Sequence, residues 1–319
     1  MGKSTIEWTH YTFNPWIGCA KVSPGCKNCY AEKDMDQRRG RACWGVNGTR
    51  SVTSYSYWRE PYKWNEEAKK SGVRKRVFCA SLADVFEDFT GAVVNNKGQK
   101  LFWPYFGSYD VDNKPNFNSE ICLTPESGIA DFSLTLDTIR LELFSLIART
   151  PHLDWLLLTK RPENIKKMVF LDWAEEVFPD NVWVGTSVEN KKEATNRIPH
   201  LMQVPAKVRF LSCEPLLEKV FIDDFTYGAT GINAFNGRDE YLGFPTDFDY
   251  PVNWVIVGGE SGHNARPMDI EWAREIMFEC KRANVPFFFK QDSQATNKTY
   301  KDDSTFPVDL QVREFPIIK

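Results

Sequence analysis

Six short apolar runs occur along the chain, and within each run the apolar positions are nearly continuous rather than alternating. They comprise residues 77–81, 155–159, 182–187, 208–212, 254–258 and 286–290. Strands of a parallel sheet are buried on both faces and have this pattern. We therefore predict six buried strands, and a further strand around residues 12–17 brings the number to seven.

Segments with a helical period lie between several of these runs. Residues 134–147 are rich in apolar positions ahead of one strand, and Ile270, Ala273 and Ile276 begin one apolar face of another helix. Alternating strands and helices are typical of α/β proteins. We predict an α/β fold in the form of a complete or partial (β/α) barrel of parallel strands with irregular insertions. A doubly wound open sheet is the alternative.

Two regions interrupt the alternation of strands and helices. They run from about residue 91 to 128 and from about residue 221 to 250, and both are rich in Asn, Asp, Gly, Pro and aromatic residues without a helical or strand period. Segments of this length and composition are typical of insertions or lids. We therefore predict a single barrel-like domain over residues 1–319 with two insertions.

The composition is that of a globular protein. The chain has 319 residues, of which 42% are hydrophobic and 26% are charged, so it can bury a large core. No stretch approaches the roughly 20 apolar residues of a membrane span, and residues 1–12 lack the apolar segment of a secretory signal. We expect a cytoplasmic protein that does not bind membranes.

Three of the eight cysteines lie close together near the N-terminus, at Cys19, Cys26 and Cys29. The last two form a Cys-x-x-Cys motif, which places two sulfurs within reach of one metal ion or cluster. Pro24 and Gly25 favour a turn that returns Cys19 to the same point. The sequence therefore predicts that this segment wraps a metal ion or cluster.

This cysteine loop, defined as residues 17–30, has three interpretations. Thiolates favour iron–sulfur clusters, zinc or cuprous copper, and a cluster held by only three protein thiolates keeps one iron free for an exogenous ligand. A structural zinc site completed by Cys43 is the second interpretation, because structural zinc has four protein ligands. Three ordinary buried thiols are the third.

The five remaining cysteines are isolated in the sequence. Scattered cysteines suit a reducing compartment better than a disulfide framework. Cys79, Cys213 and Cys280 fall inside apolar patterns, and we predict that they are small core residues.

A basic segment with interleaved aromatic residues follows the cysteine loop. The basic residues are Lys33, Arg38, Arg39, Arg41, Arg50, Lys69, Lys70, Arg74, Lys75 and Arg76, and the aromatic residues are Trp44, Tyr55, Tyr57, Trp58 and Trp64. This composition is typical of a surface that binds single strands or flipped bases. It is equally typical of a solvated face over a small core, and the net charge of −3 argues against a broad grip on nucleic acid.

Polar residues follow each predicted strand. They are Ser81 and Asp84, then Thr159, Lys160 and Arg161, then Ser187, Glu189 and Asn190, then Ser212 and Glu214, then Glu260 and Ser261, and finally Lys290 and Gln291. A single serine of this kind is most simply a helix cap or turn residue. The carboxyl ends of parallel strands, however, converge on the ligand site, so the whole set predicts an active site there.

The charged members of this set suit particular ligand groups. Glu214 and Glu260 are candidates for contact with a ligand ammonium or hydroxyl group. Lys160, Arg161, Arg266 and Lys290 could hold a carboxylate or phosphate, because arginine in particular pairs with such groups through two hydrogen bonds.

Other common catalytic patterns are absent from the sequence. The four histidines have no metal-ligand spacing, and there is neither a Gly-x-Ser-x-Gly elbow nor a Walker-type phosphate loop. The cysteine loop is therefore the predicted chemical centre.

The chain resembles a phage and bacterial three-cysteine-motif family of unknown function, which is itself similar to radical S-adenosylmethionine (radical SAM) iron–sulfur enzymes. The resemblance is carried by residues 5–9 through 29–31, 78–86, 158–162, 184–190, 211–216, 258–262, 265–268 and 285–291. Two features depart from the radical SAM pattern. Six residues rather than three separate the first two cysteines, and Asn28 stands before the last cysteine where an aromatic residue is usual, with Tyr30 following it.

The resemblance implies a 4Fe–4S cluster on Cys19, Cys26 and Cys29 and S-adenosylmethionine bound at the free iron. We predict cofactor contacts from Tyr30, Ser81, Asp84, Ser187, Glu189 and Glu214, and substrate contacts from Lys160, Arg161, Glu260, Arg266, Lys290 and Gln291. An electron donor and a partner protein encoded nearby are the implied partners, and nucleic acid or a modified base is one candidate substrate. A zinc- or cluster-stabilised nucleic-acid-binding module without catalysis is the alternative.

Overall fold

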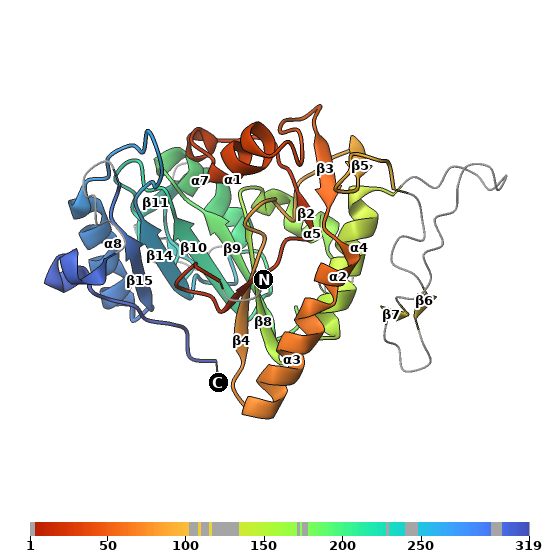
Figure 1. The fold of residues 1–319 in the computed structure, drawn as a ribbon. Coiled ribbons are helices and arrows are strands. Elements are labelled where there is room, and N and C mark those ends of the chain that lie inside the picture. The colour runs from red at the N-terminus through yellow and green to blue at the C-terminus, as the bar shows by residue number, and fades with distance from the viewer. Residues whose placement is uncertain are drawn as a thin grey trace.

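A seven-stranded parallel sheet, curled into a half-barrel, forms the centre of the computed structural model (Figure 1). The structure describes residues 4–101, 108–109, 115–116, 134–170, 173, 178–227, 230–239, 248–294 and 302–318. In spatial order the strands are β1 (Tyr11–Thr12), β4 (Lys75–Cys79), β8 (Leu153–Thr159), β9 (Val182–Ser187), β10 (Val208–Cys213), β14 (Trp254–Gly258) and β15 (Phe287–Gln291). Spatial order follows chain order, whereas a doubly wound sheet reverses direction at a switch point. The prediction of a partial barrel is therefore confirmed.

Each strand is apolar along its length because both of its faces are covered. Alternate residues such as Val77, Trp155 and Val255 pack against the outer helices. The residues between them, including Leu156 and Trp254, pack together on the inner face. All six predicted buried strands are confirmed, with ends that differ by at most two residues.

Aromatic side chains fill the inner face toward the amino ends of the strands. The ring of Trp8 lies 4.7 Å from that of Phe78 and 6.2 Å from that of Trp254, and Phe315 lies 5.4 Å from Trp254 between ring centroids. Segments near both ends of the chain thus close this side of the half-barrel.

The seventh strand, predicted around residues 12–17, is confirmed as β1 but ends early, because the chain leaves the main sheet at Asn14 and Pro15. Only β1 joins the main sheet, while β2 (Trp16–Ile17) pairs with β3 (Thr49–Val52) in a second sheet that also contains β5 (Ala92–Val94). Pro15 has no N–H to donate to a ladder, and the side chain of Asn14 accepts a hydrogen bond from the backbone of Leu82 at 2.8 Å.

Helices cover the outer face of the sheet, except for the first, which directly follows Cys29 at the carboxyl ends of the strands (Figure 1). They are α1 (Tyr30–Glu32), which continues as a π-helical turn (Lys33–Arg38), α2 (Tyr55–Trp58), α3 (Glu60–Ser71), α4 (Leu136–Ala148), α5 (Ile165–Met168), α7 (Lys191–Leu201) and α8 (Ile270–Ala283). The helices predicted at 134–147 and from residue 270 are confirmed as α4 and α8. Within the described residues, none of the helices has the length and apolar character needed to cross a membrane.

The region predicted as an irregular insertion at 221–250 contains a small antiparallel sheet. Its strands are β11 (Phe225–Tyr227), β12 (Thr230–Asn233) and β13 (Arg238–Asp239). The backbone of Tyr250 bonds to Met202 at the end of α7, and the N–H groups of Ile222 and Asp223 bond to Glu279 of α8. The described part of the insertion therefore contacts the end of α7 and α8.

Most of the other predicted insertion, residues 91–128, lies outside the described residues. The described part includes β5 and the paired strands β6 (Ser108–Tyr109) and β7 (Pro115–Asn116).

Glu279 should make the stability of the fold depend on pH. Burial raises the pKa of this carboxyl from 4.5 to about 7, Asp223 adds to the rise, and the bonds from the Ile222 and Asp223 backbones oppose it. Unfolding releases the carboxyl to its ordinary pKa, so stability is fullest below pH 4.5 and falls as the pH rises toward 7.

We expect Glu279→Gln, which keeps the accepting oxygen, to stabilise the protein by about 3 kcal/mol at pH 8 and to leave it unchanged at pH 4. Urea unfolding at both pH values measures this. The control Glu66→Gln, at an exposed position of α3, should show no such difference. Equal effects of Glu279→Gln at both pH values would contradict the assignment.

Candidate functional site

The cysteine loop crosses the carboxyl ends of the parallel strands. Three sets of hydrogen bonds and ion pairs, here called fastenings, hold it there. Its contacts reach residues that follow β4 and β8, then β9, and finally β14. The loop comes from the first tenth of the chain, and its partners are spread over the next 240 positions. The expected convergence of polar residues at this edge is thus confirmed for the residues that hold the loop.

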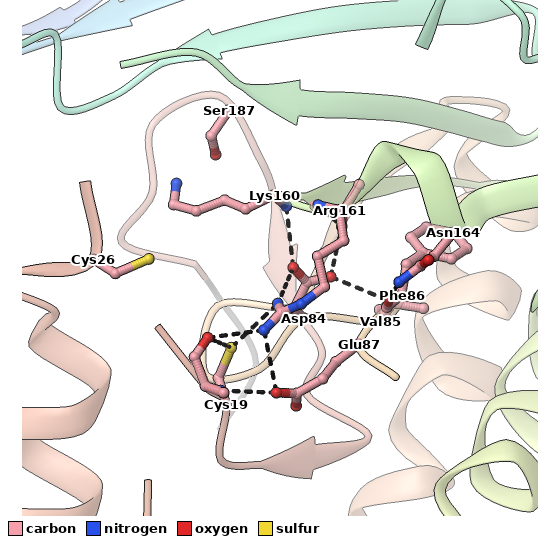
Figure 2. A network of polar contacts seen from close by, with 12 residues as sticks. Cys19, Cys26, Asp84, Val85, Phe86, Glu87, Lys160, Arg161, Asn164 and Ser187 are labelled. Atoms are coloured by element: carbon pink, nitrogen blue, oxygen red, sulfur yellow. Dashed lines mark hydrogen bonds and ion pairs between the residues drawn. The ribbon is translucent and has the colours of Figure 1, made fainter. Parts of the chain in front are cut away.

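The first fastening is a buried network of charges (Figure 2). Arg161 bonds through Nη1 to Asp84 Oδ2 at 2.8 Å and through Nη2 to the carbonyl oxygen of Ala20 at 2.8 Å. Glu87 Oε1 accepts from the Ala20 N–H at 2.8 Å, and Glu87 also pairs with Arg50 at 2.7 Å. The two arginines balance the two carboxylates, so the loop is held by a network with no net charge.

The segment that carries these carboxylates is itself immobilised. Arg140 of α4 donates to the carbonyl oxygens of Val85 and Glu87 at 2.7 and 2.8 Å, and Asn164 donates to that of Phe86 at 3.0 Å. Three consecutive carbonyl groups are therefore satisfied by side chains from elsewhere in the fold. This fixes the backbone from which Glu87 reaches the cysteine loop.

The second fastening is Glu189, which follows β9 and is fully buried. Its Oε1 accepts hydrogen bonds from the Ser23 hydroxyl and the Gly25 N–H, and its Oε2 pairs with Arg197 of α7 at 2.8 Å. Burial alone would raise the pKa of Glu189, but the charges of Lys160 and Arg197 and the bonds from the loop outweigh it and lower the pKa. The carboxylate is thus ionised where it grips the loop.

Gly25 is required for this second fastening. A Cβ atom at position 25 would lie 2.8 Å from Glu189 Oε1 and 2.9 Å from its carboxyl carbon. Glycine therefore lets the loop backbone approach the carboxylate closely enough for its N–H to bond.

The third fastening is the pair formed by Glu260 and Arg266 after β14. Asn28 donates to Glu260 Oε2 at 2.9 Å, and Arg266 Nη1 donates to the carbonyl oxygen of Pro24 at 3.0 Å. Burial opposes ionisation of Glu260, but the bonds from Arg266 and Asn28 prevail and lower its pKa. Glu260 and Arg266, predicted as substrate contacts, are thus engaged with each other and with the cysteine loop.

The three thiols of the loop have different surroundings. Burial raises the pKa of Cys19 to about 12, with Glu87 and Asp84 adding to the rise and Arg161 opposing it. Burial also raises the pKa of Cys29. Hydrogen bonds from the N–H groups of Glu32 and Ala31 oppose this rise, and the nearby Cys26 adds to it. Cys26 Sγ lies 3.8 Å from the Ser23 hydroxyl. In the described segments, no three thiol, imidazole or carboxylate groups are gathered closely enough to hold a metal ion.

The inner face beside the loop carries Tyr30, Glu214 and Lys290. The Tyr30 ring is 56% exposed, but its hydroxyl donates to the Ser81 carbonyl oxygen at 2.8 Å. Burial of the hydroxyl raises the pKa of Tyr30, and the nearby Cys29 and Glu214 raise it further. The hydrogen bond to Ser81 lowers it in part. Lys290 Nζ lies 2.6 Å from Glu214 Oε1, and Ser212 donates to Glu214 Oε2 at 3.2 Å. These groups, from three strand ends, meet next to Cys29.

Glu214 Oε1 is a buried oxygen without an aligned hydrogen-bond donor among the described residues. The short contact with Lys290 is an ion pair whose angles are not those of a hydrogen bond, so the two observations agree. Gly258 makes room for this carboxylate, since a Cβ atom there would lie 2.9 Å from Glu214 Oε1.

The remaining predicted site residues divide into two groups. The oxygens of Asp84 accept four hydrogen bonds from within the protein, and Gln291 donates to the Gly259 carbonyl oxygen at 2.7 Å, so both support the backbone. The side chains of Lys160 and Ser187 lie on the side of Cys26 (Figure 2), and the Lys160 ammonium has no hydrogen bond or ion pair among the described residues.

The residues that sequence reasoning missed are those that hold the loop rather than those that face a ligand. They are Ser23, Asn28, Arg50, Glu87 and Arg197. The sequence pattern could have indicated that Arg197 is buried, because Arg197 lies on the same face of α7 as Ala194, Ile198 and Leu201. The indication for Glu87 is weaker, since it follows the apolar pair Val85 and Phe86.

Part of the basic aromatic segment is core rather than surface. Arg50, Trp58 and Trp64 are at most 4% exposed, and the ring of Trp64 stacks on Tyr11 at 4.5 Å. Arg74 pairs with Asp154 at 2.7 Å. Trp58 and Trp64 thus belong to the main hydrophobic core and Arg50 to the buried charge network, whereas the Arg74 side chain is 43% exposed.

A cavity of about 450 Å³ opens beside the cysteine loop, between the segment that follows β8 and one face of α7. Its lining includes Val22, Asp88, Arg161, Glu163, Arg197 and His200. Arg161 thus borders the cavity and also contacts the loop. The volume lies within the usual range for small-molecule sites.

A family model described as "Protein of unknown function (DUF5131)" matches residues 3–97 and 127–308. The chain belongs to this family. No curated protein and no solved structure gives a significant match to it. The two matched segments contain the cysteine loop and each of the three fastenings, so the site described above lies entirely within the DUF5131 region.

The buried charge network should be a large contributor to stability. Arg50→Met removes a side chain that is fully buried with Glu87 and leaves a carboxylate without its closest partner. We expect a loss of about 3–5 kcal/mol in the free energy of unfolding, because an unpaired buried charge is costly. Urea unfolding measures it, with Arg38→Met as the control, since Arg38 forms an exposed pair with Asp34 worth less than about 1 kcal/mol. Similar small losses for both variants would show that the network is dispensable.

Proposed function

We propose that the protein is an iron–sulfur enzyme of radical SAM type, with a 4Fe–4S cluster on Cys19, Cys26 and Cys29. The observation that carries the proposal is the placement of a three-thiol loop across the carboxyl ends of a parallel half-barrel. These ends are where catalytic groups of such folds are found. The proposal also includes the binding of S-adenosylmethionine to this cluster.

The donor set suits an iron–sulfur cluster. Thiolates are soft ligands that such clusters favour, and three of them leave one iron open to an exogenous ligand. Metal binding replaces the thiol protons. The proposal rests on the thiol chemistry and the position of the loop, because no three metal-ligating groups are gathered among the described residues.

Glu214 supplies an independent reason to expect a ligand next to the loop. The Lys290 ammonium lies 2.6 Å from the buried Oε1 of Glu214 without donating an aligned hydrogen bond, so this oxygen can still accept one from a further donor. An ammonium group near Cys29 would satisfy it. S-adenosylmethionine carries an ammonium and a carboxylate, and the ammonium of Lys160 is available for the latter.

The residues of the chain would bind, orient and shield, while the cofactors supply the reactivity. When held by Cys19, Cys26 and Cys29, the cluster would supply one-electron reducing chemistry to bound S-adenosylmethionine. The aromatic packing at the amino ends of the strands closes one side of the site to water. The cavity beside the loop is a candidate position for the substrate, and the required electron comes from a separate donor protein.

Anaerobic purification and reconstitution, followed by iron, sulfide and zinc analysis, tests the centre. We expect about four iron atoms per chain in the wild type and in Cys43→Ala, and their loss in Cys26→Ala. Cys43 is the matched control because it is an exposed cysteine outside the loop. Stoichiometric zinc without iron would overturn the cluster.

A second measurement tests the reaction. Reduction of the loaded protein with dithionite in the presence of S-adenosylmethionine should yield deoxyadenosine, detected by mass spectrometry, and Cys26→Ala should yield none. A cluster that forms but produces no deoxyadenosine would overturn the radical SAM assignment while leaving the iron–sulfur centre in place.

A metal-stabilised nucleic-acid-binding module is the second candidate function. It is favoured by one contact, in which the Gly45 N–H donates to the Cys19 carbonyl oxygen at 3.0 Å, because this brings the segment containing Cys43 against the cysteine loop. In that case Cys43→Ala should release the metal as completely as Cys26→Ala does. Retention of the metal in Cys43→Ala would exclude a four-cysteine site.

A further inference from the structure

Arg161 makes a contact that the family resemblance does not assign. It follows β8, its side chain is 10% exposed, and its Nη1 donates a hydrogen bond to Cys19 Sγ at 3.7 Å (Figure 2). The same guanidinium binds the Ala20 carbonyl oxygen, the next position along the loop. It therefore fixes both the sulfur and the backbone beside it.

The groups that hydrogen-bond to the other two sulfurs are neutral. Cys26 Sγ faces the Ser23 hydroxyl, and Cys29 is near the N–H groups of Ala31 and Glu32. Among the side chains that the structure describes, Arg161 is the only charged donor bonded to a sulfur of the loop. Its effect on a bound metal centre should therefore be concentrated at Cys19.

Two carboxylates fix the orientation of the Arg161 guanidinium group. Asp84 accepts from Nη1 at 2.8 Å, and Glu87 lies 3.3 Å from Nη2. The planar fork of arginine can serve these carboxylates, a carbonyl oxygen and a sulfur together, whereas lysine has a single ammonium. A side chain so fully engaged has little freedom to leave Cys19.

We propose that Arg161 is a positioning residue that holds Cys19 Sγ as a ligand and polarises it through a charged hydrogen bond. Hydrogen bonds to cluster sulfurs, and nearby positive charge, stabilise the reduced state and raise the reduction potential. Removing Arg161 also leaves Asp84 and Glu87 less compensated beside Cys19, which acts in the same direction. This role rests on the proposed function for the cluster and replaces the substrate contact predicted for Arg161.

Potentiometric titration of the reconstituted cluster, monitored by electron paramagnetic resonance, tests the polarisation. We expect Arg161→Met to lower the equilibrium constant for reduction about tenfold, which is 59 mV for one electron. Arg161→Lys keeps the charge and should recover more than half of the shift. Arg50→Met breaks the same buried network without touching a sulfur, so it should lower the unfolding free energy yet shift the potential by less than half as much.

Equal potentials in wild type, Arg161→Met and Arg161→Lys would overturn the polarising role and leave Arg161 as a strut. Competition with a chelator tests the holding role for any metal. Arg161→Met should weaken metal retention by about 10- to 100-fold, and Arg50→Met by less than one third of that factor. If the protein proves to hold zinc, the cluster proposal fails while this second test still decides whether Arg161 holds Cys19. Unchanged retention would overturn that role.

Discussion

The buried pairing of Arg50 and Arg161 with Glu87 and Asp84 is the interaction on which the site depends. Two cations and two anions are removed from water together, and such a group is tolerated only when each charge has its partner. The four side chains come from β3 and from the segments that follow β4 and β8. Glu87 and Arg161 also bind the backbone of Ala20, the residue after Cys19. The position of Cys19 therefore depends on all four charged side chains being in place.

The half-barrel separates stability from chemistry along the strand direction. Toward the amino ends, the inner face is packed with aromatic rings, including the well-packed Trp254. Toward the carboxyl ends, the same face carries Ser187, Glu214 and Lys290, and the cysteine loop crosses it. The amino ends of the strands therefore contribute apolar packing on this face, while the carboxyl ends contribute the polar groups beside the cysteine loop.

The sequence predicted the sheet well because parallel strands buried on both faces leave an unmistakable apolar run. It predicted the location of the site for a similar reason, since polar residues at strand ends converge whatever their individual roles. It could not separate ligand contacts from loop supports, because Asp84 and Glu214 have the same chemistry and differ only in which hydrogen bonds are already made. Buried arginines such as Arg50 were missed because a charged residue in a basic segment is normally at the surface.

The fastenings of the cysteine loop also set an order of events during synthesis. Pro24 and Asn28 are held by residues 260–266, which are more than 230 positions away, so the loop leaves the ribosome long before its last partners exist. The cysteine loop therefore lacks its contacts with Glu260 and Arg266 until almost the whole polypeptide has emerged. Docking of the cysteine loop onto the strand ends is therefore completed late in folding, and a chain truncated before Glu260 would carry all three cysteines without the third set of contacts that holds the loop.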